Sequence, residues 1–187
     1  YPIAYAADGG VINAKSADAK GFGSVMAFSR NSGTVNVDGN ITAVDEWATN
    51  ASASSKYKNI GAYATGIGST IVVKGNAIIN GMGAFADNGA IITIGGLGSN
   101  INAGESIGIA ATNGGIINFG GGTITVGTGS LDDTKSFYAD SSSKINFTGA
   151  TTINITKGDL IVGDASDYGA AMGTSTIYNG MSNVDIN

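Results

Sequence analysis

Short runs of alternating apolar and polar residues recur along the whole chain. In each copy an apolar residue, usually followed by Ala, leads through a turn of Gly, Ser, Asn or Asp to Ile or Val, then a polar residue and a second apolar one. The copies begin at Tyr5, Phe28, Tyr63, Phe85, Ala110, Tyr138 and Ala170. Alternation at period two is the pattern of a β-strand that buries one face. The chain therefore reads as a series of repeated strands.

The spacing of the copies predicts the fold. The central aliphatic residues of the copies are Ile12, Val35, Ile71, Ile92, Ile117, Ile145 and Ile177. A second short strand follows most of them after a Gly-containing turn, at 39–41, 75–78, 123–126 and 152–155, and a third precedes several, at 22–25, 60–63, 82–85 and 107–110. Three short strands per repeat, with uneven spacing, predict an all-β right-handed parallel β-helix of about seven coils with corner-loop insertions.

Stacking of coils explains why such a repeat folds. One coil cannot bury its inward face, whereas coils stacked about 4.8 Å apart pair every strand with its neighbours and close a continuous aliphatic core. Outward polar residues then align along the rod at Asn13, Asn36, Thr93, Asn118 and Asn146. We expect these to form a hydrogen-bonded ladder that stabilises the stack. A flat polar face that binds glycans is the alternative interpretation.

Composition narrows the class of protein. Charged residues make up 12% of the chain and the net charge is −5, with only nine Lys and Arg, which disfavours nucleic acid as a partner. Cysteine is absent, which is compatible with an exported bacterial protein, and no apolar run is long enough to span a membrane as a helix. We expect residues 1–187 to be a single β-helix segment excised from a longer chain, with unpaired strand edges at both ends that invite end-to-end stacking.

Two segments carry a resemblance to a known family. Ile107-Gly108-Ile109-Ala110-Ala111 and Ile60-Gly61-Ala62-Tyr63-Ala64, each followed by a turn and an Ile-x-Val-like strand, resemble the passenger domains of large bacterial autotransporter adhesins of the fusobacterial type. The resemblance implies a right-handed β-helix stalk, export through an outer-membrane barrel, display at the bacterial cell surface and a role in attachment and virulence. It carries over no functional residue, because the shared pattern is a folding repeat.

The sequence offers little for catalysis. Histidine is absent, which excludes Ser-His-Asp and Cys-His chemistry and imidazole metal sites, and we expect no catalytic residue, metal site or cofactor. Loop carboxylates are the exception, since paired acids could cleave a polysaccharide as a lyase or hydrolase on the same rod. The candidates are Asp45, Glu46, Asp132, Asp133, Asp159, Asp164 and Asp167. They do not recur in register within the strands, so solvated loop charges are the preferred interpretation.

The segment 45–59 is the predicted protruding insertion and holds the candidate binding residues. Trp47 is the only tryptophan, and Tyr57 stands between Lys56 and Lys58. An aromatic residue on a loop above a rigid rod can anchor a contact. Alternatively, Trp47 folds back over the flank of its own coil or touches a neighbouring one.

Taken together, the sequence favours a non-catalytic structural and adhesive segment of a cell-surface passenger. Its expected partners are host-cell or bacterial surface proteins or glycans, reached without membrane insertion of this segment. A trimeric adhesin head would need a stricter repeat, and a β-sandwich would need regular antiparallel turns.

Overall fold

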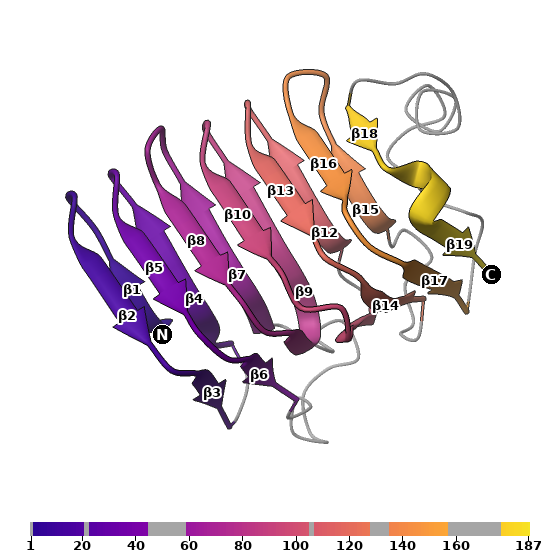
Figure 1. Ribbon diagram of the computed structural model, residues 1–187, viewed down its shortest axis with the longest axis horizontal. Helices are drawn as coiled ribbons and strands as arrows, with labels where there is room; N and C mark the ends of the chain where they lie inside the picture. The colour runs from indigo at the N-terminus through magenta and orange to yellow at the C-terminus, as the bar shows by residue number, and fades with distance from the viewer. Residues whose placement is uncertain (1, 21–22, 45–58, 105–106, 128–134, 157–176) are drawn as a thin grey trace.

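The chain folds as an all-β solenoid of parallel strands, seen in a computed structural model that describes residues 2–20, 23–44, 59–104, 107–127, 135–156 and 177–187. Every strand pair in these ranges is parallel, and successive coils lie side by side from the N-terminal to the C-terminal end (Figure 1). The predicted all-β class and parallel β-helix architecture are confirmed.

Each coil runs through three sides, which we call A, B and C. Side A contains β1 (Pro2–Ala6), β4 (Val25–Arg30), β7 (Asn59–Thr65), the second half of β9 (Ala77–Asp87), β12 (Ile107–Thr112) and β15 (Lys135–Ala139). Side B contains β2 (Val11–Ala14), β5 (Thr34–Val37), β8 (Thr70–Val73), β10 (Ile91–Ile94), β13 (Ile116–Phe119), β16 (Lys144–Phe147) and β18 (Tyr178–Asn179). Side C contains β3 (Ala17–Ala19), β6 (Ile41–Ala43), the first half of β9, β11 (Ser99–Gly104), β14 (Gly122–Val126), β17 (Thr151–Ile155) and β19 (Val184–Ile186). A short 3-10 turn, η2 (Met181–Asn183), joins β18 to β19.

The solenoid makes about five turns, so the predicted number of seven coils was too high. Side B explains the difference. Five of its strands, β5, β8, β10, β13 and β16, have a paired neighbour on both sides, whereas β2 and β18 are its edges. The edge strand β18 has only two residues. The first and last repeats thus supply the edge strands of side B, and the five strands between them are paired on both sides.

The predicted register holds through six of the seven repeats. Ile12, Val35, Ile71, Ile92, Ile117 and Ile145 form one column of directly paired positions. The seventh prediction was wrong by one residue, because Tyr178 rather than Ile177 pairs with Ile145. The Tyr178 ring packs edge-on against Phe137 at 5.0 Å, and its hydroxyl accepts a hydrogen bond from the Ala139 N–H. Because its ring fills the core, Tyr178 faces inward, and Ile177 precedes the strand β18.

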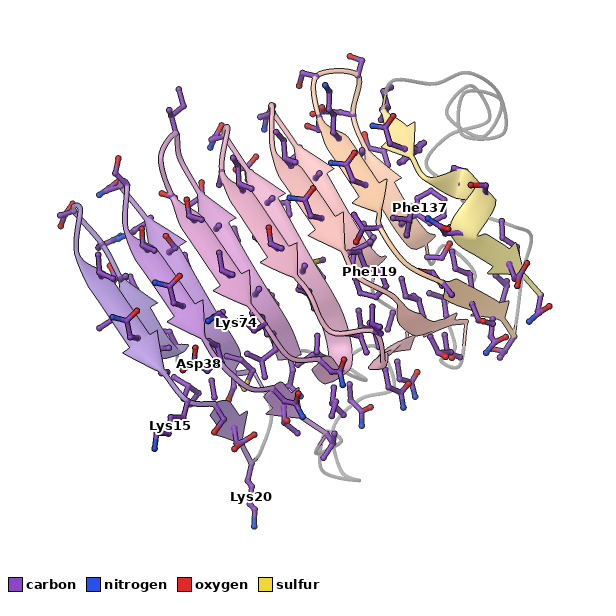
Figure 2. All side chains as sticks on the ribbon, in the orientation of Figure 1. Lys15, Lys20, Asp38, Lys74, Phe119 and Phe137 are labelled. Carbon is purple, nitrogen blue, oxygen red and sulfur yellow. The ribbon has the colours of Figure 1, made fainter. Side chains whose placement is uncertain are left out.

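The core is aliphatic at the N-terminal end and aromatic at the C-terminal end. Val35, Ile71, Ile92 and Ile117 are all completely buried, and so are Ala residues close to the corners, such as Ala64 and Ala86. The last three repeats instead bring four buried rings together: Phe119, Phe137, Phe147 and Tyr178. Figure 2 labels Phe119 and Phe137 between the strands of this end.

Tight turns join side A to side B. Asp8-Gly9, Asn88-Gly89 and Asn113-Gly114 all have two successive positive φ angles, between 50° and 82°. In the first, the Gly10 N–H donates to the Ala7 carbonyl at 2.8 Å, which closes a four-residue turn of the I′ class. The same dipeptides close antiparallel hairpins in other proteins. Here they redirect the chain between two parallel sheets.

The bend from side C to side A explains the glycine in the repeated apolar-Gly-apolar segment. Gly83 and Ala84 of β9 are buried in succession, so the alternation slips by one residue and both positions face inward. A Cβ at Gly61 would overlap the Gly83 carbonyl, and one at Gly108 would overlap the Ser136 carbonyl of the next coil. Only glycine allows the coils to approach this closely at the bend.

Ser136 stands at the same bend and provides a test of core chemistry. Its side chain is fully buried, and its hydroxyl has no hydrogen-bond partner among the residues that the structure describes. An unsatisfied buried hydroxyl costs about 1–3 kcal/mol. We therefore expect Ser136→Ala to raise the free energy of unfolding by about 1 kcal/mol, measured by chemical denaturation.

Ser29 is the matched control for that substitution. It is equally buried, but its hydroxyl donates a hydrogen bond to the Gly33 carbonyl. We expect Ser29→Ala to lower the free energy of unfolding by about 1 kcal/mol. Equal effects of the two alanine substitutions would contradict this account of Ser136.

Candidate contact surface

The residues predicted to bind a partner lie outside the described part of the chain. Trp47, Lys56, Tyr57 and Lys58 all fall within 45–58, and Asn59, the last residue of the predicted insertion, begins β7. The candidate carboxylates lie outside it too: Asp45, Glu46, Asp132, Asp133, Asp159, Asp164 and Asp167. The candidate site is therefore sought on the described strands.

The described ranges hold no group of three or more His, Cys, Asp or Glu side chains suited to a metal ion. They also contain no helix long and apolar enough to cross a membrane. Asp140 is an acid engaged in a corner turn: burial raises its pKa, but hydrogen bonds from the Asn113 N–H, Ser143 and Ser142 outweigh burial and hold the pKa below its ordinary value. Asp140 thus caps a turn, and its hydrogen-bond partners are neutral groups rather than a second carboxylate.

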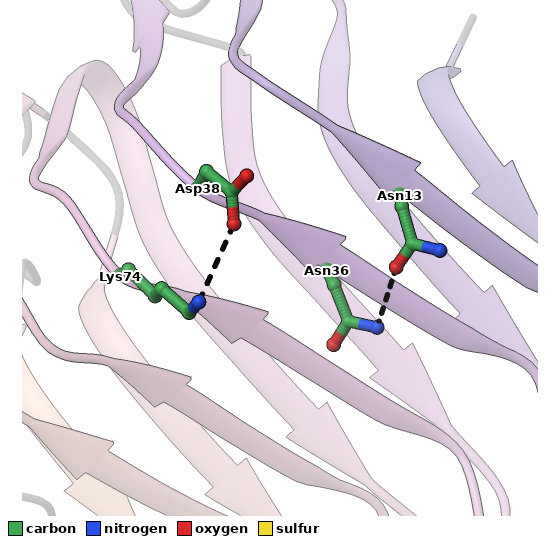
Figure 3. A network of polar contacts seen from close by, with 4 residues as sticks. All are labelled: Asn13, Asn36, Asp38 and Lys74. Atoms are coloured by element: carbon green, nitrogen blue, oxygen red, sulfur yellow. Dashed lines mark hydrogen bonds and ion pairs between the residues drawn. The ribbon is translucent and has the colours of Figure 1, made fainter.

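The outer surface of side B carries the predicted polar ladder, next to a mixed outward row of Val11, Thr34, Thr70, Ile91, Ile116 and Lys144. The Asn36 amide donates to Asn13 at 3.0 Å (Figure 3), and the Asn146 amide donates to Asn118 at 2.8 Å. The Asn118 amide donates to the Thr93 hydroxyl at 3.2 Å, and the Asn179 amide donates to Asn146 at 2.9 Å. Asn179 was not among the residues predicted for the ladder. Val72 interrupts the ladder between Asn36 and Thr93. Beside it, Lys74 and Asp38 form an exposed ion pair at 3.5 Å.

The outer surface of side C is also largely polar. One outward row runs through directly paired residues of successive strands: Asp18, Thr42, Ile78, Asn100, Thr123, Thr152 and Asp185. A second row contains Asn80, Asn102, Thr125 and Asn154. Sides B and C therefore each present at least one row of polar side chains in register from coil to coil.

The outer surface of side A is different, because aromatic rings stack along it. Tyr5, Phe28, Tyr63 and Phe85 occupy paired positions on β1, β4, β7 and β9. Their ring centroids are 5.2, 5.0 and 5.1 Å apart, and their planes are within 16° of parallel. The Arg30 guanidinium lies over the Tyr5 ring at 5.5 Å from its centroid. The row continues through Ala110 to Tyr138.

A second apolar row runs beside the rings. Val25, Ile60 and Met82 are paired on successive strands, Ile107 takes the next position on β12, and all four are partly exposed. On the other flank of the rings lie Arg30, Thr65, Asp87 and Thr112, again in register. We call these three rows, from β1 to β12, the contact face. It is the one largely apolar outer surface among the three sides of the described coils.

The geometry of the rings limits what the contact face can bind. Each ring covers the face of the next, so the row presents ring edges to solvent. A sugar needs an open ring face to stack on, and the interior rings do not offer one. Ring edges and aliphatic side chains are instead suited to an apolar protein surface.

The sequence contained a signal for the contact face. In the repeats at Tyr5, Tyr63 and Phe85 the residue after the aromatic is a buried Ala. Period-two alternation then places the aromatic residue outward. The aromatic residue that begins these repeats is therefore expected on the outer surface of side A.

Comparisons with known proteins return nothing: no family model, no curated protein and no solved structure matches this chain.

Proposed function

We propose that this chain is a non-catalytic structural and adhesive segment of a bacterial cell-surface autotransporter passenger. In this proposal the coil is right-handed, as nearly all crossover connections between parallel strands are. The segment is exported across the outer membrane, needs no cofactor, and takes host-cell or bacterial surface proteins or glycans as partners. The resemblance of its repeats to adhesin passengers supports this assignment.

The observation that carries the proposal is the contrast between the contact face and the two polar sides. Partly exposed apolar residues that form a contiguous patch on a soluble surface mark a place where another surface binds. The polar ladder of side B joins one coil to the next, and the rings of the contact face also stack from coil to coil, but the contact face in addition leaves apolar side chains partly exposed. The insertion 45–59 is a second contact element in this proposal, on the strength of its sequence alone.

Attachment can be measured with beads coated with the 187-residue chain and exposed to host cells or to other bacteria. We expect the wild type to attach, and Tyr63→Lys, which puts a charge in the middle of the contact face, to reduce attachment about tenfold. The control Thr123→Lys changes the outer surface of side C and should leave attachment unchanged. Deletion of 45–58 measures the insertion separately.

Two results would overturn the proposal. Wild-type beads that attach no better than bare beads would leave the segment as a spacer without adhesive activity. Cleavage of a polysaccharide by the chain would make it an enzyme, although no observation on the described residues favours that alternative.

A further inference from the structure

We propose that the contact face binds the same face of a second copy of this chain, with the two rods antiparallel. This inference deepens the proposed function by naming a partner for the contact face. It starts from the row of Arg30, Thr65 and Asp87, which lie on consecutive coils in direct register. The row places a cation on one side of Thr65 and an anion on the other.

Neither charge is neutralised within the described residues. Arg30 is exposed and forms no ion pair there; its guanidinium lies over the Tyr5 ring. The carboxylate of Asp87 accepts hydrogen bonds only from neutral groups, namely the Thr112 hydroxyl at 2.7 Å and the side-chain amides of Asn113 and Asn88, each at 2.9 Å. Both charges therefore retain their attraction for an external partner of opposite sign.

A twofold axis along β7 makes the two charges complementary. Such an axis reverses the order of the coils, so it lays β4 of one copy over β9 of the other. Arg30 then faces Asp87 of the second copy, and the pair occurs twice because the interface is isologous. The arginine side chain is long enough to turn outward from its place over Tyr5. Thr65 and Tyr63 lie near the axis and meet their own equivalents.

The periodicity of the contact face favours a second copy over an unrelated protein. Its outward residues repeat once per coil, about every 4.8 Å. Another surface stays in register with it over five coils only if its own side chains repeat at the same spacing. A second copy of the chain has that spacing because it is built from the same coils. The two apolar rows of one copy then pack against the two apolar rows of the other, and the row of Arg30, Thr65 and Asp87 forms ion pairs along one edge of the interface.

The size of the contact face sets the expected strength. Five coils and three outward rows span roughly 24 Å by 20 Å, or about 500 Å². A stable interface buries about 800 Å² on each partner. We therefore expect weak self-association, with a dissociation constant between about 10 µM and 1 mM, which rods presented at high density on surfaces would strengthen by multivalency.

Sedimentation velocity of the 187-residue chain from about 1 µM to 1 mM tests this inference. The wild type should pass from monomer to dimer with rising concentration. Arg30→Glu and Asp87→Lys should each weaken the dimer at least tenfold, because each puts like charges opposite one another twice. An equimolar mixture of the two variants should restore it, since every charge then meets its opposite.

A second variant keeps the test decisive if loss of the Asp87 hydrogen bonds impairs folding. Thr65→Lys places two like charges near the twofold axis and touches no core position, so it should weaken the dimer to the same degree. The control Thr123→Lys adds the same charge on side C and should leave dimerisation unchanged. Thermal unfolding of each variant verifies that it is folded.

Three outcomes would overturn the inference: a wild type that stays monomeric at 1 mM, a mixture that associates no better than its two components, or open-ended filaments from end-to-end stacking. These outcomes are separable from failure of the proposed function. A strictly monomeric chain whose beads still attach to cells retains the adhesive role and loses only this partner, whereas a dimer whose beads attach to nothing retains the partner and loses the role.

Discussion

Gly122→Ala is expected to lower the free energy of unfolding by about 3–4 kcal/mol. Gly122 begins β14 with φ at 128°, a conformation that side chains rarely adopt. A Cβ there would also overlap the backbone oxygen and nitrogen of Ser99 on the previous coil. Neither atom can move without breaking the ladder between β11 and β14, so strain and overlap add. Chemical denaturation measures the change.

Gly98→Ala is the control for this substitution. Gly98 has no positive φ, and an added Cβ would make an ordinary contact, 3.4 Å from the Asn76 amide nitrogen. Its effect should stay below about 1 kcal/mol. If Gly122→Ala were as stable as Gly98→Ala, the close approach of β14 to β11 would be wrong.

Sequence reasoning predicted the fold well where the physics is local and repeated. Alternation at period two determines which residues of β5, β8 and β10 face inward, and stacking requires that the inward residues of successive coils coincide. Val35, Ile71 and Ile92 therefore form one buried column without any further information. Paired outward amides such as Asn13 and Asn36 follow from the same register.

The prediction failed where one residue changes the alternation. At the bend before side A, Gly83 and Ala84 both face inward, and no period-two pattern anticipates that slip. At the last repeat, the buried ring of Tyr178 determines the register, and its neighbour Ile177 looked equally suitable in the sequence. Such choices depend on which side chain fills the space left by the previous coil, and that space is created by the tertiary structure.

The candidate site was predictable only in part, because the aromatic residues have two roles that composition cannot separate. Phe119 and Phe137 fill the core, whereas Phe28 and Phe85 stack on the outer surface of side A. All four occur in short apolar segments of similar appearance. The position of each ring relative to the buried Ala or Ile beside it decides the role, so the contact face emerges once the bend at Gly83 is known.

Ile92→Ala, in the middle of the buried aliphatic column, should lower the free energy of unfolding by about 3 kcal/mol. Ile92 is completely buried and lies between Ile71 and Ile117 on the neighbouring coils. Removal of its side chain leaves a cavity that the paired backbones on both sides cannot close, so the loss includes a cavity contribution as well as lost burial. Equilibrium unfolding in urea measures it.

The preceding residue of the same strand is an unusually close control. Ile91 has the same side chain and is adjacent to Ile92 in β10, but it faces outward and is 38% exposed. Ile91→Ala should therefore cost less than about 1 kcal/mol, since most of the deleted surface loses no buried contact. The ratio of the two effects reports directly on which face of β10 is inside. Comparable losses at both positions would mean that the strand is not one-sided, and the stacked-coil architecture, together with the assignment of side A as the apolar outer surface, would have to be abandoned.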